Sequence, residues 1–84
     1  MKLYLISQTE NDGYDTYSSA VVAAKDEEEA KEMHPEGHIL KVPRDWKEPC
    51  GSWASGKRYV KVQCIGIATR GTKRQVICAS FHAG

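Results

Sequence analysis

The sequence lacks any long apolar run, and this excludes a membrane-spanning helix of the usual kind. No stretch of its 84 residues approaches the roughly 18 consecutive apolar residues that a helix needs to cross a bilayer. Residues 1–7 have no extended apolar core of the secretory type, because the chain turns polar from Gln8 onward. We therefore expect a cytoplasmic protein that does not contact a membrane.

Cysteines are few, and no two of them lie close together. An odd number of cysteines without a close pair predicts neither a disulfide framework nor a zinc ribbon. Cys64 and Cys78 fall within apolar strand patterns, where a thiol acts as a small hydrophobic side chain, whereas Cys50 lies between a proline and a glycine. We expect three reduced thiols, of which only Cys50 is exposed.

Signatures of catalysis and metal binding are also missing. The glycines are too scattered for a phosphate-binding loop. His34 and His38 have the spacing of a helical metal pair, but Pro35 and Gly37 between them break the helix that the pair would need. The acidic run that precedes them is typical of a solvated helix face rather than of paired catalytic carboxylates. We therefore expect no enzyme activity, no metal and no cofactor.

What the sequence does contain is a set of strand patterns around one short helix. Residues 2–8 predict a first strand, and neither of its faces is fully polar, which favours a central position. Asp12 and Gly13 can supply the positive φ angles of a tight turn, so residues 14–24 are expected to return antiparallel. Composition agrees with a folded domain, because 40% of the residues are hydrophobic and only 27% are charged.

Residues 26–34 predict the helix. Asp26 is a good N-cap, and Glu29 stands at the position of a capping-box partner. Ala30 and Met33 are its only apolar stripe, so docking rather than intrinsic propensity should hold this helix in place.

The second half of the chain predicts up to three more strands. Residues 38–42 are a short candidate, and 58–69 and 75–81 are longer ones. The alternation changes phase near Gly66, which indicates either a bulge or burial of both strand faces. If the basic segment 70–74 is a turn, the last two strands form a second hairpin.

These elements predict an α+β domain in the order β-β-α-(β)-β-β, with one helix on one face of a small antiparallel sheet of four or five strands. Residues 1–84 form this single domain. Residues 43–57 show no periodicity and are expected to form an irregular loop that contains Trp46 and Trp53. Large rings can cover a small core or anchor an interface, and we favour the core while keeping both tryptophans as candidate partner-binding residues.

The net charge of +1 hides an asymmetry along the chain. Residues 1–36 hold three lysines and nine acidic residues, whereas residues 37–84 hold nine basic and two acidic residues, so the halves carry −6 and +7. In the acidic half, we expect Glu28, Glu29 and Glu32 to form a partner-binding helix face.

The basic half suggests a different surface. If the last two strands pair, their basic residues line one end and one edge of the sheet and could contact phosphates. Lysines and arginines at such a place also protect a sheet edge against aggregation. The candidate nucleic-acid-binding residues are Arg58, Lys61, Arg70, Lys73 and Arg74.

Two segments of the chain resemble a family of short, mostly uncharacterised proteins encoded by phages and prophages. They are residues 1–24, MKLYLISQTENDGYDTYSSAVVAA, and residues 71–84, GTKRQVICASFHAG. Small phage proteins of this sort include inhibitors of bacterial defence, among them anti-CRISPR proteins, which act by binding a host effector and in most cases catalyse no reaction. The resemblance implies a phage origin, and no motif in it assigns a site residue.

We therefore expect a phage-encoded inhibitor of the anti-CRISPR kind that acts in the host bacterial cytoplasm. Its partner would be a CRISPR effector or another host defence protein, and it would block the nucleic-acid contacts of that partner. The alternative is a small nucleic-acid-binding phage accessory protein that uses the basic strand pair.

Overall fold

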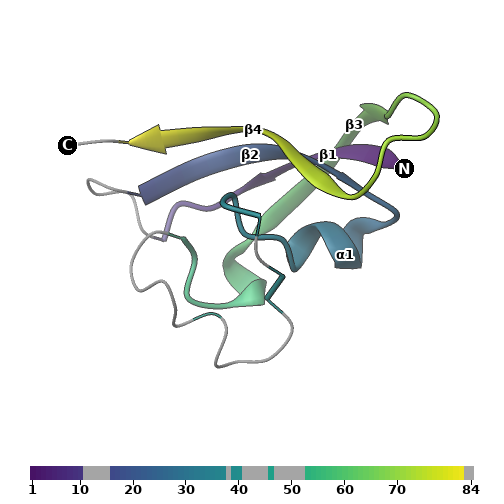
Figure 1. Ribbon diagram of the computed structural model, residues 1–84. Coiled ribbons are helices and arrows are strands. Elements are labelled where there is room, and N and C mark those ends of the chain that lie inside the picture. The colour runs from purple at the N-terminus through teal and green to yellow at the C-terminus, as the bar shows by residue number, and fades with distance from the viewer. Residues whose placement is uncertain (11–15, 38, 41–45, 47–52, 83–84) are drawn as a thin grey trace.

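A four-stranded antiparallel sheet carries one short helix on one face, and this confirms the predicted α+β class (Figure 1). The computed structural model describes residues 1–10, 16–37, 39–40, 46 and 53–82. In chain order the elements are β1 (Lys2–Ser7), β2 (Thr16–Ala24), α1 (Glu27–Lys31), the 3₁₀ helix η2 (Lys57–Tyr59), β3 (Lys61–Ile67) and β4 (Gln75–His82).

The first two strands form the centre of the sheet, as the sequence predicted. β1 pairs antiparallel with β2, with Lys2 opposite Ala24 and Ser7 opposite Ser19. The turn predicted at Asp12 and Gly13 lies outside the described residues. β1 is central because β3 occupies its other side, in the strand order β3-β1-β2-β4.

The predicted second hairpin is wrong, because β3 and β4 lie at opposite edges of the sheet. Each strand instead pairs antiparallel with one side of the central hairpin. Residues 68–74 run past the end of that hairpin, where the Ala68 amide donates to the Met1 carbonyl at 3.1 Å. A turn follows, in which the Thr72 amide donates to the Thr69 carbonyl and Gly71 adopts a φ of 90°.

Simple lengths explain why this connection is possible. The two edge strands are three strand spacings apart, or roughly 14 Å. Seven residues can extend to roughly 23 Å, so the segment does not need to fold back on itself as a hairpin. Periodicity identified both strands, but it contains no information about which free edge each strand would take.

Helix α1 is shorter than predicted, because it ends well before His34. The Met33 amide donates to the Ala30 carbonyl, and this i to i+3 hydrogen bond tightens the turn that ends the helix. Met33 then forms an isolated β-bridge with Ile39. The Leu40 amide also donates to the Glu32 carbonyl at 2.6 Å. Of the candidate strand 38–42, only residues 39 and 40 are described, and the bridge at Ile39 is its only sheet-like pairing among them.

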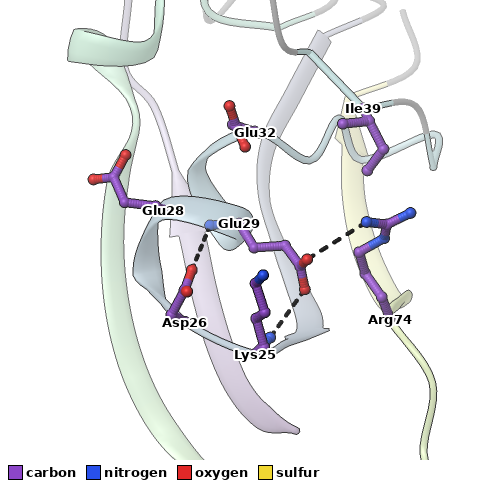
Figure 2. A pocket seen from close by; sticks show the side chains of 7 residues that line it. All are labelled: Lys25, Asp26, Glu28, Glu29, Glu32, Ile39 and Arg74. Carbon is purple, nitrogen blue, oxygen red and sulfur yellow. Dashed lines mark hydrogen bonds and ion pairs between the residues drawn. The ribbon is translucent and has the colours of Figure 1, made fainter.

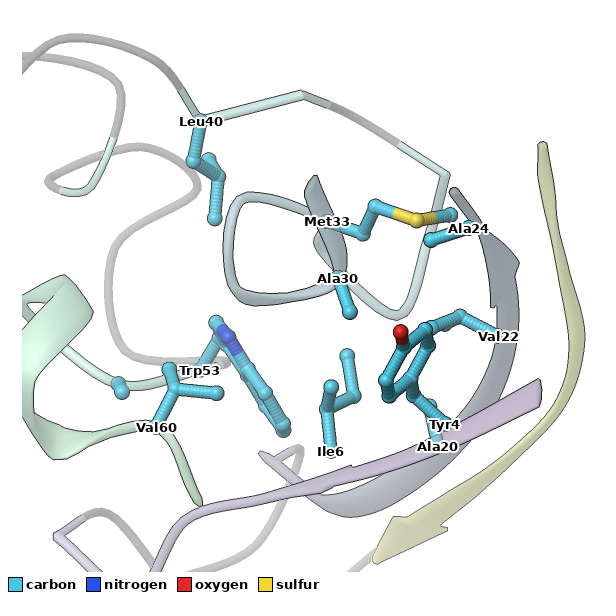
Figure 3. Packing of buried hydrophobic residues seen from close by; sticks show 11 residues of the cluster. Tyr4, Ile6, Ala20, Val22, Ala24, Ala30, Met33, Leu40, Trp53 and Val60 are labelled. Carbon is cyan, nitrogen blue, oxygen red and sulfur yellow. The ribbon is translucent and has the colours of Figure 1, made fainter. Parts of the chain in front are cut away.

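The core lies between the sheet and the layer that contains α1 (Figure 3). Ile6 and Val22 project from the two central strands and are fully buried, and Met33, which follows α1, is buried in the same cluster. Trp53 joins the same cluster with only 4% of its surface exposed. The buried hydrophobic residues of the cluster are Tyr4, Ile6, Ala20, Val22, Ala24, Ala30, Met33, Leu40, Trp53, Ala54 and Val60.

The edge strands decide two further predictions, the bulge near Gly66 and the burial of two cysteines. Leu3 is opposite Gly66 and Tyr4 is opposite Cys64, so Ile65 is an inserted residue and the predicted bulge near Gly66 is confirmed. The expected burial of the thiols at Cys64 and Cys78 is wrong, because both are free and exposed on edge strands.

Cys50 lies outside the described residues, as does most of the loop predicted at 43–57. No helix in the described part of the chain is long and apolar enough to cross a membrane.

Candidate functional site

The start of α1 is fixed by reciprocal hydrogen bonds, as the capping pattern predicted. The Glu29 amide donates to the Asp26 carboxylate at 2.8 Å, and the Lys25 amide donates to the Glu29 carboxylate at 3.0 Å. The return bond therefore reaches one residue further back than in the usual capping box. Glu29 is a structural residue as a result, and only 15% of its side chain is exposed.

A pocket of about 250 Å³ lies between this helix start and the beginning of β4 (Figure 2). Arg74 reaches across it, with its guanidinium 3.5 Å from the second carboxylate oxygen of Glu29. The pocket wall is mixed in charge, because two cations stand among its acids. Its lining residues are Lys25, Asp26, Glu28, Glu29, Glu32, Ile39 and Arg74.

Lys57 neutralises the other side of α1. Its ammonium donates to the Glu28 carboxylate at 2.5 Å and lies 4.0 Å from Glu32. The hydrogen bond from Lys57, together with its charge, lowers the pKa of Glu28, and the same bond raises the pKa of Lys57. Because both groups are solvated, the pair adds little to stability, but it keeps Glu28 ionised.

The three predicted acidic residues therefore differ in what they can offer a partner. All three face a cation of the chain itself, but the side chain of Glu28 is 70% exposed, whereas those of Glu29 and Glu32 are partly covered. Asp26 and Glu27 are exposed as well, and neither has an ion pair within the described ranges. We call Asp26, Glu27 and Glu28 the acidic cap.

Sequence reasoning missed part of this set. Glu27 was not among the expected partner-binding residues, although it lies in the first turn of α1 and is exposed. Ala30 is the one buried residue of α1, and the positions opposite it on the helix are Glu28 and Glu32. Glu27 stands three residues before Ala30, on a neighbouring part of the helix surface, so helical periodicity alone does not identify it as exposed.

The candidate basic residues do not line one end and one edge of a shared strand pair, because that arrangement depended on the incorrect hairpin. Lys61 lies on β3, whereas Arg70 and Lys73 lie in the connection to β4. Arg58 stacks over its neighbour Tyr59, with the guanidinium carbon 4.8 Å from the ring centre. Arg74 is bound to α1, as described above. A role of these residues in nucleic-acid binding stays a prediction.

The tryptophans separate into two kinds. Trp53 is a core residue, so its ring is covered, and its indole N–H is buried without a hydrogen-bond partner in the described structure. Trp46 is partly buried and packs against the core, which leaves some of its ring accessible. Of the two, only Trp46 keeps a surface that a partner could contact.

His34 is a buried core histidine. Its Nδ1 accepts a hydrogen bond from the Glu36 amide at 3.0 Å, and its ring makes an edge contact with Tyr17 at 5.9 Å between centroids. Trp53 packs on the same imidazole at 6.3 Å. His38, its predicted neighbour in a metal-pair spacing, lies outside the described residues.

Comparison of the chain with protein-family models, curated proteins and solved structures gives no match. The resemblance to short phage proteins therefore stays a prediction. The geometry offers a candidate binding surface, the acidic cap, at a helix start that is held by two capping hydrogen bonds.

Proposed function

We propose that the protein is a phage-encoded, non-catalytic inhibitor that binds a bacterial defence complex, most specifically an anti-CRISPR protein. It acts in the host cytoplasm. It covers a basic surface on a CRISPR effector that would otherwise contact nucleic acid.

The acidic cap is the observation that carries this proposal. Asp26, Glu27 and Glu28 present exposed carboxylates on consecutive residues. The bond from the Glu29 amide to the Asp26 carboxylate and the bond from the Lys25 amide to the Glu29 carboxylate fix the backbone beneath them. Consecutive negative groups on a rigid support resemble the phosphates that a nucleic-acid-binding surface attracts. Complementary charge of this kind guides association and selects the partner.

Protection of a phage from CRISPR immunity tests the proposal. The wild-type protein, expressed in a CRISPR-bearing host, should restore plaque formation by a targeted phage, and the variant E27Q/E28Q should lose this effect. Gln preserves size and helix propensity, and both residues lie outside the hydrogen bonds that cap the helix. Glu29 is left unchanged because its loss would alter the fold of α1.

The matched control is E10Q/E36Q, which removes the same amount of negative charge away from α1. Glu10 accepts two bonds from Ser55, one on each carboxylate oxygen, and Glu36 accepts one from Tyr17. Gln keeps one acceptor oxygen at each site, and at position 10 its amide group can donate to the Ser55 hydroxyl in place of the second bond. This control should protect the phage as the wild type does. Equal protection by E27Q/E28Q would remove the acidic cap as the binding surface.

A nucleic-acid-binding accessory protein is the second candidate function, and one observation favours it. Arg70 and Lys73 are exposed, and they have no ion pair among the described residues. They flank the turn at Gly71, where a phosphate backbone could approach closely. A gel shift at low salt that R70Q/K73Q abolishes would support this function, and the absence of any shift by the wild type would eliminate it.

A further inference from the structure

Strand β4 is an edge strand with an uncharged sequence. It is last in the strand order, so one row of its backbone N–H and C=O groups has no strand partner in the described sheet (Figure 1). Its eight residues, QVICASFH, contain no Lys, Arg, Asp, Glu, Pro or Gly. Natural proteins usually protect such an edge with charge, proline or an irregularity, because an open row of backbone groups recruits other strands.

The opposite edge, β3, makes the contrast clear. β3 begins with an exposed lysine, Lys61, and contains Gly66, which weakens strand pairing. Each edge strand has one inserted isoleucine at a bulge, Ile65 in β3 and Ile77 in β4. Their exposed fractions are nearly equal, at 47% and 49%. β3 also exposes Ile67, at 82%, so among the described side chains it shows more large apolar surface than β4. What distinguishes β4 is therefore its lack of charge and of glycine, not its bulge or its exposed apolar surface.

We propose that β4 pairs antiparallel with β4 of a second copy of this chain. A two-fold axis through the strand pair brings the same residues of both copies together, and the two sheets become one continuous sheet of eight strands. The uncharged strand is its own best complement, because self-pairing places no like charges opposite each other. The backbone groups of the edge then gain the partners that they lack in one chain.

The position of α1 is compatible with this dimer. The helix packs mainly against β1, β2 and β3, so pairing through β4 does not press the two acidic caps against each other. A single strand pair is smaller than the interface of a standard stable complex, which buries roughly 1,600 Å². We therefore expect a dimer whose population rises with protein concentration.

Sedimentation of the intact protein at increasing concentration tests this pairing. The wild type should pass from monomer to dimer, whereas I77K should remain monomeric. Ile77 lies near the midpoint of β4, so in the strand pair the two substituted lysines would come close together and repel each other. The matched control I65K adds the same charge at the equivalent bulge of β3 and should dimerise as the wild type does. Circular dichroism establishes that both variants are folded.

Two sedimentation results would overturn the proposal. One is a wild-type protein that stays monomeric at every concentration. The other is a dimer that I65K disrupts as much as I77K does, since that would place the contact elsewhere.

Cross-linking gives a second, independent readout. Cys78 lies next to the midpoint of β4, so in a two-fold strand pair its thiol comes close to that of its copy, whereas Cys64 lies on the far edge. Under mild oxidation, C50S/C64S should form a covalent dimer that is seen without reductant, and C50S/C78S should not. Equal cross-linking of the two variants would contradict pairing through β4.

Discussion

Asp26 joins the fold of this protein to its candidate site, because one carboxylate both caps α1 and belongs to the acidic cap. Its oxygen accepts the Glu29 amide at 2.8 Å, and the exposed side chain carries negative charge. At a helix N-cap, asparagine accepts the same bond without the charge, whereas alanine cannot. Substitution at this position can therefore separate stability from binding.

We predict that D26A lowers the free energy of unfolding by about 1 kcal/mol, since a lost N-cap bond typically has this effect. D26N should stay close to the wild type in stability because it keeps the cap. Urea unfolding followed by circular dichroism measures both. If D26N were destabilised as much as D26A, the charge rather than the hydrogen bond would be what holds the start of the helix.

At the scale of elements, the turn in the β3–β4 connection depends on one glycine. Gly71 has a φ of 90°, which side-chain-bearing residues rarely adopt, although no atom lies within 4 Å of where a Cβ would be. G71A should therefore cost about 1 kcal/mol through backbone strain alone. G66A is the control, because Gly66 has an ordinary φ and its added Cβ would meet only a Leu3 methyl at 3.9 Å. Equal thermal stability of G71A and the wild type would contradict this explanation.

Local signals in the sequence were enough to predict the four strands and the start of the helix, although not where the helix ends or the short helix η2. Alternation identified the strands, Asp26 and Glu29 marked the start of the helix, and the phase change near Gly66 indicated the bulge. The strand order could not be predicted in the same way, because a central hairpin offers two similar edges and the choice is made by tertiary packing. The expected burial of Cys64 and Cys78 was wrong for the same reason, because the alternation of apolar and polar residues does not reveal which strands lie at the edges of the sheet.

The candidate site was less predictable than the fold. The acidic segment was found from composition, but the pairing of Lys57 with Glu28 joins residues that are far apart in the chain. Arg74 and Glu29 form a second such pair. Both pairs depend on how η2 and the start of β4 approach α1, and no local pattern encodes this. The most exposed part of the acidic segment, the acidic cap, could therefore be defined only from the structure, and one of its three carboxylates, Glu28, is itself paired with Lys57.

At the scale of the whole molecule, the stability of the fold should fall in alkaline solution. Burial raises the pKa of Tyr4 above its ordinary value of 10.0, and the charges of Cys64, Glu27 and Asp26 add to the effect. Above pH 10 the unfolded chain loses this proton while the folded chain retains it, so the free energy of unfolding decreases as pH rises. Y4F should weaken this dependence in urea unfolding, and Y59F, which alters an exposed ring, should not.

Tyr4 does not account for the whole alkaline loss. Burial also raises the pKa of Tyr17, with Glu36 contributing, and the bond to Glu28 raises that of Lys57. Y4F should therefore reduce the slope of stability against pH without abolishing it. An unchanged slope in Y4F would contradict burial of a neutral Tyr4 in the core.

The acidic cap also predicts how the affinity for a partner depends on salt concentration. Its carboxylates are exposed, so their attraction to a basic surface should be screened as salt is added. The wild-type protein should therefore bind its target more weakly at high ionic strength. The difference between wild type and E27Q/E28Q should shrink under the same conditions.

The most direct test of the proposed function is a pull-down of the tagged protein from a lysate of a CRISPR-bearing bacterium, with identification of what co-purifies. We predict one host CRISPR ribonucleoprotein with the wild type and with E10Q/E36Q, and its loss with E27Q/E28Q. Recovery of no such complex, or equal recovery with E27Q/E28Q, would contradict an inhibitor that binds through the acidic cap.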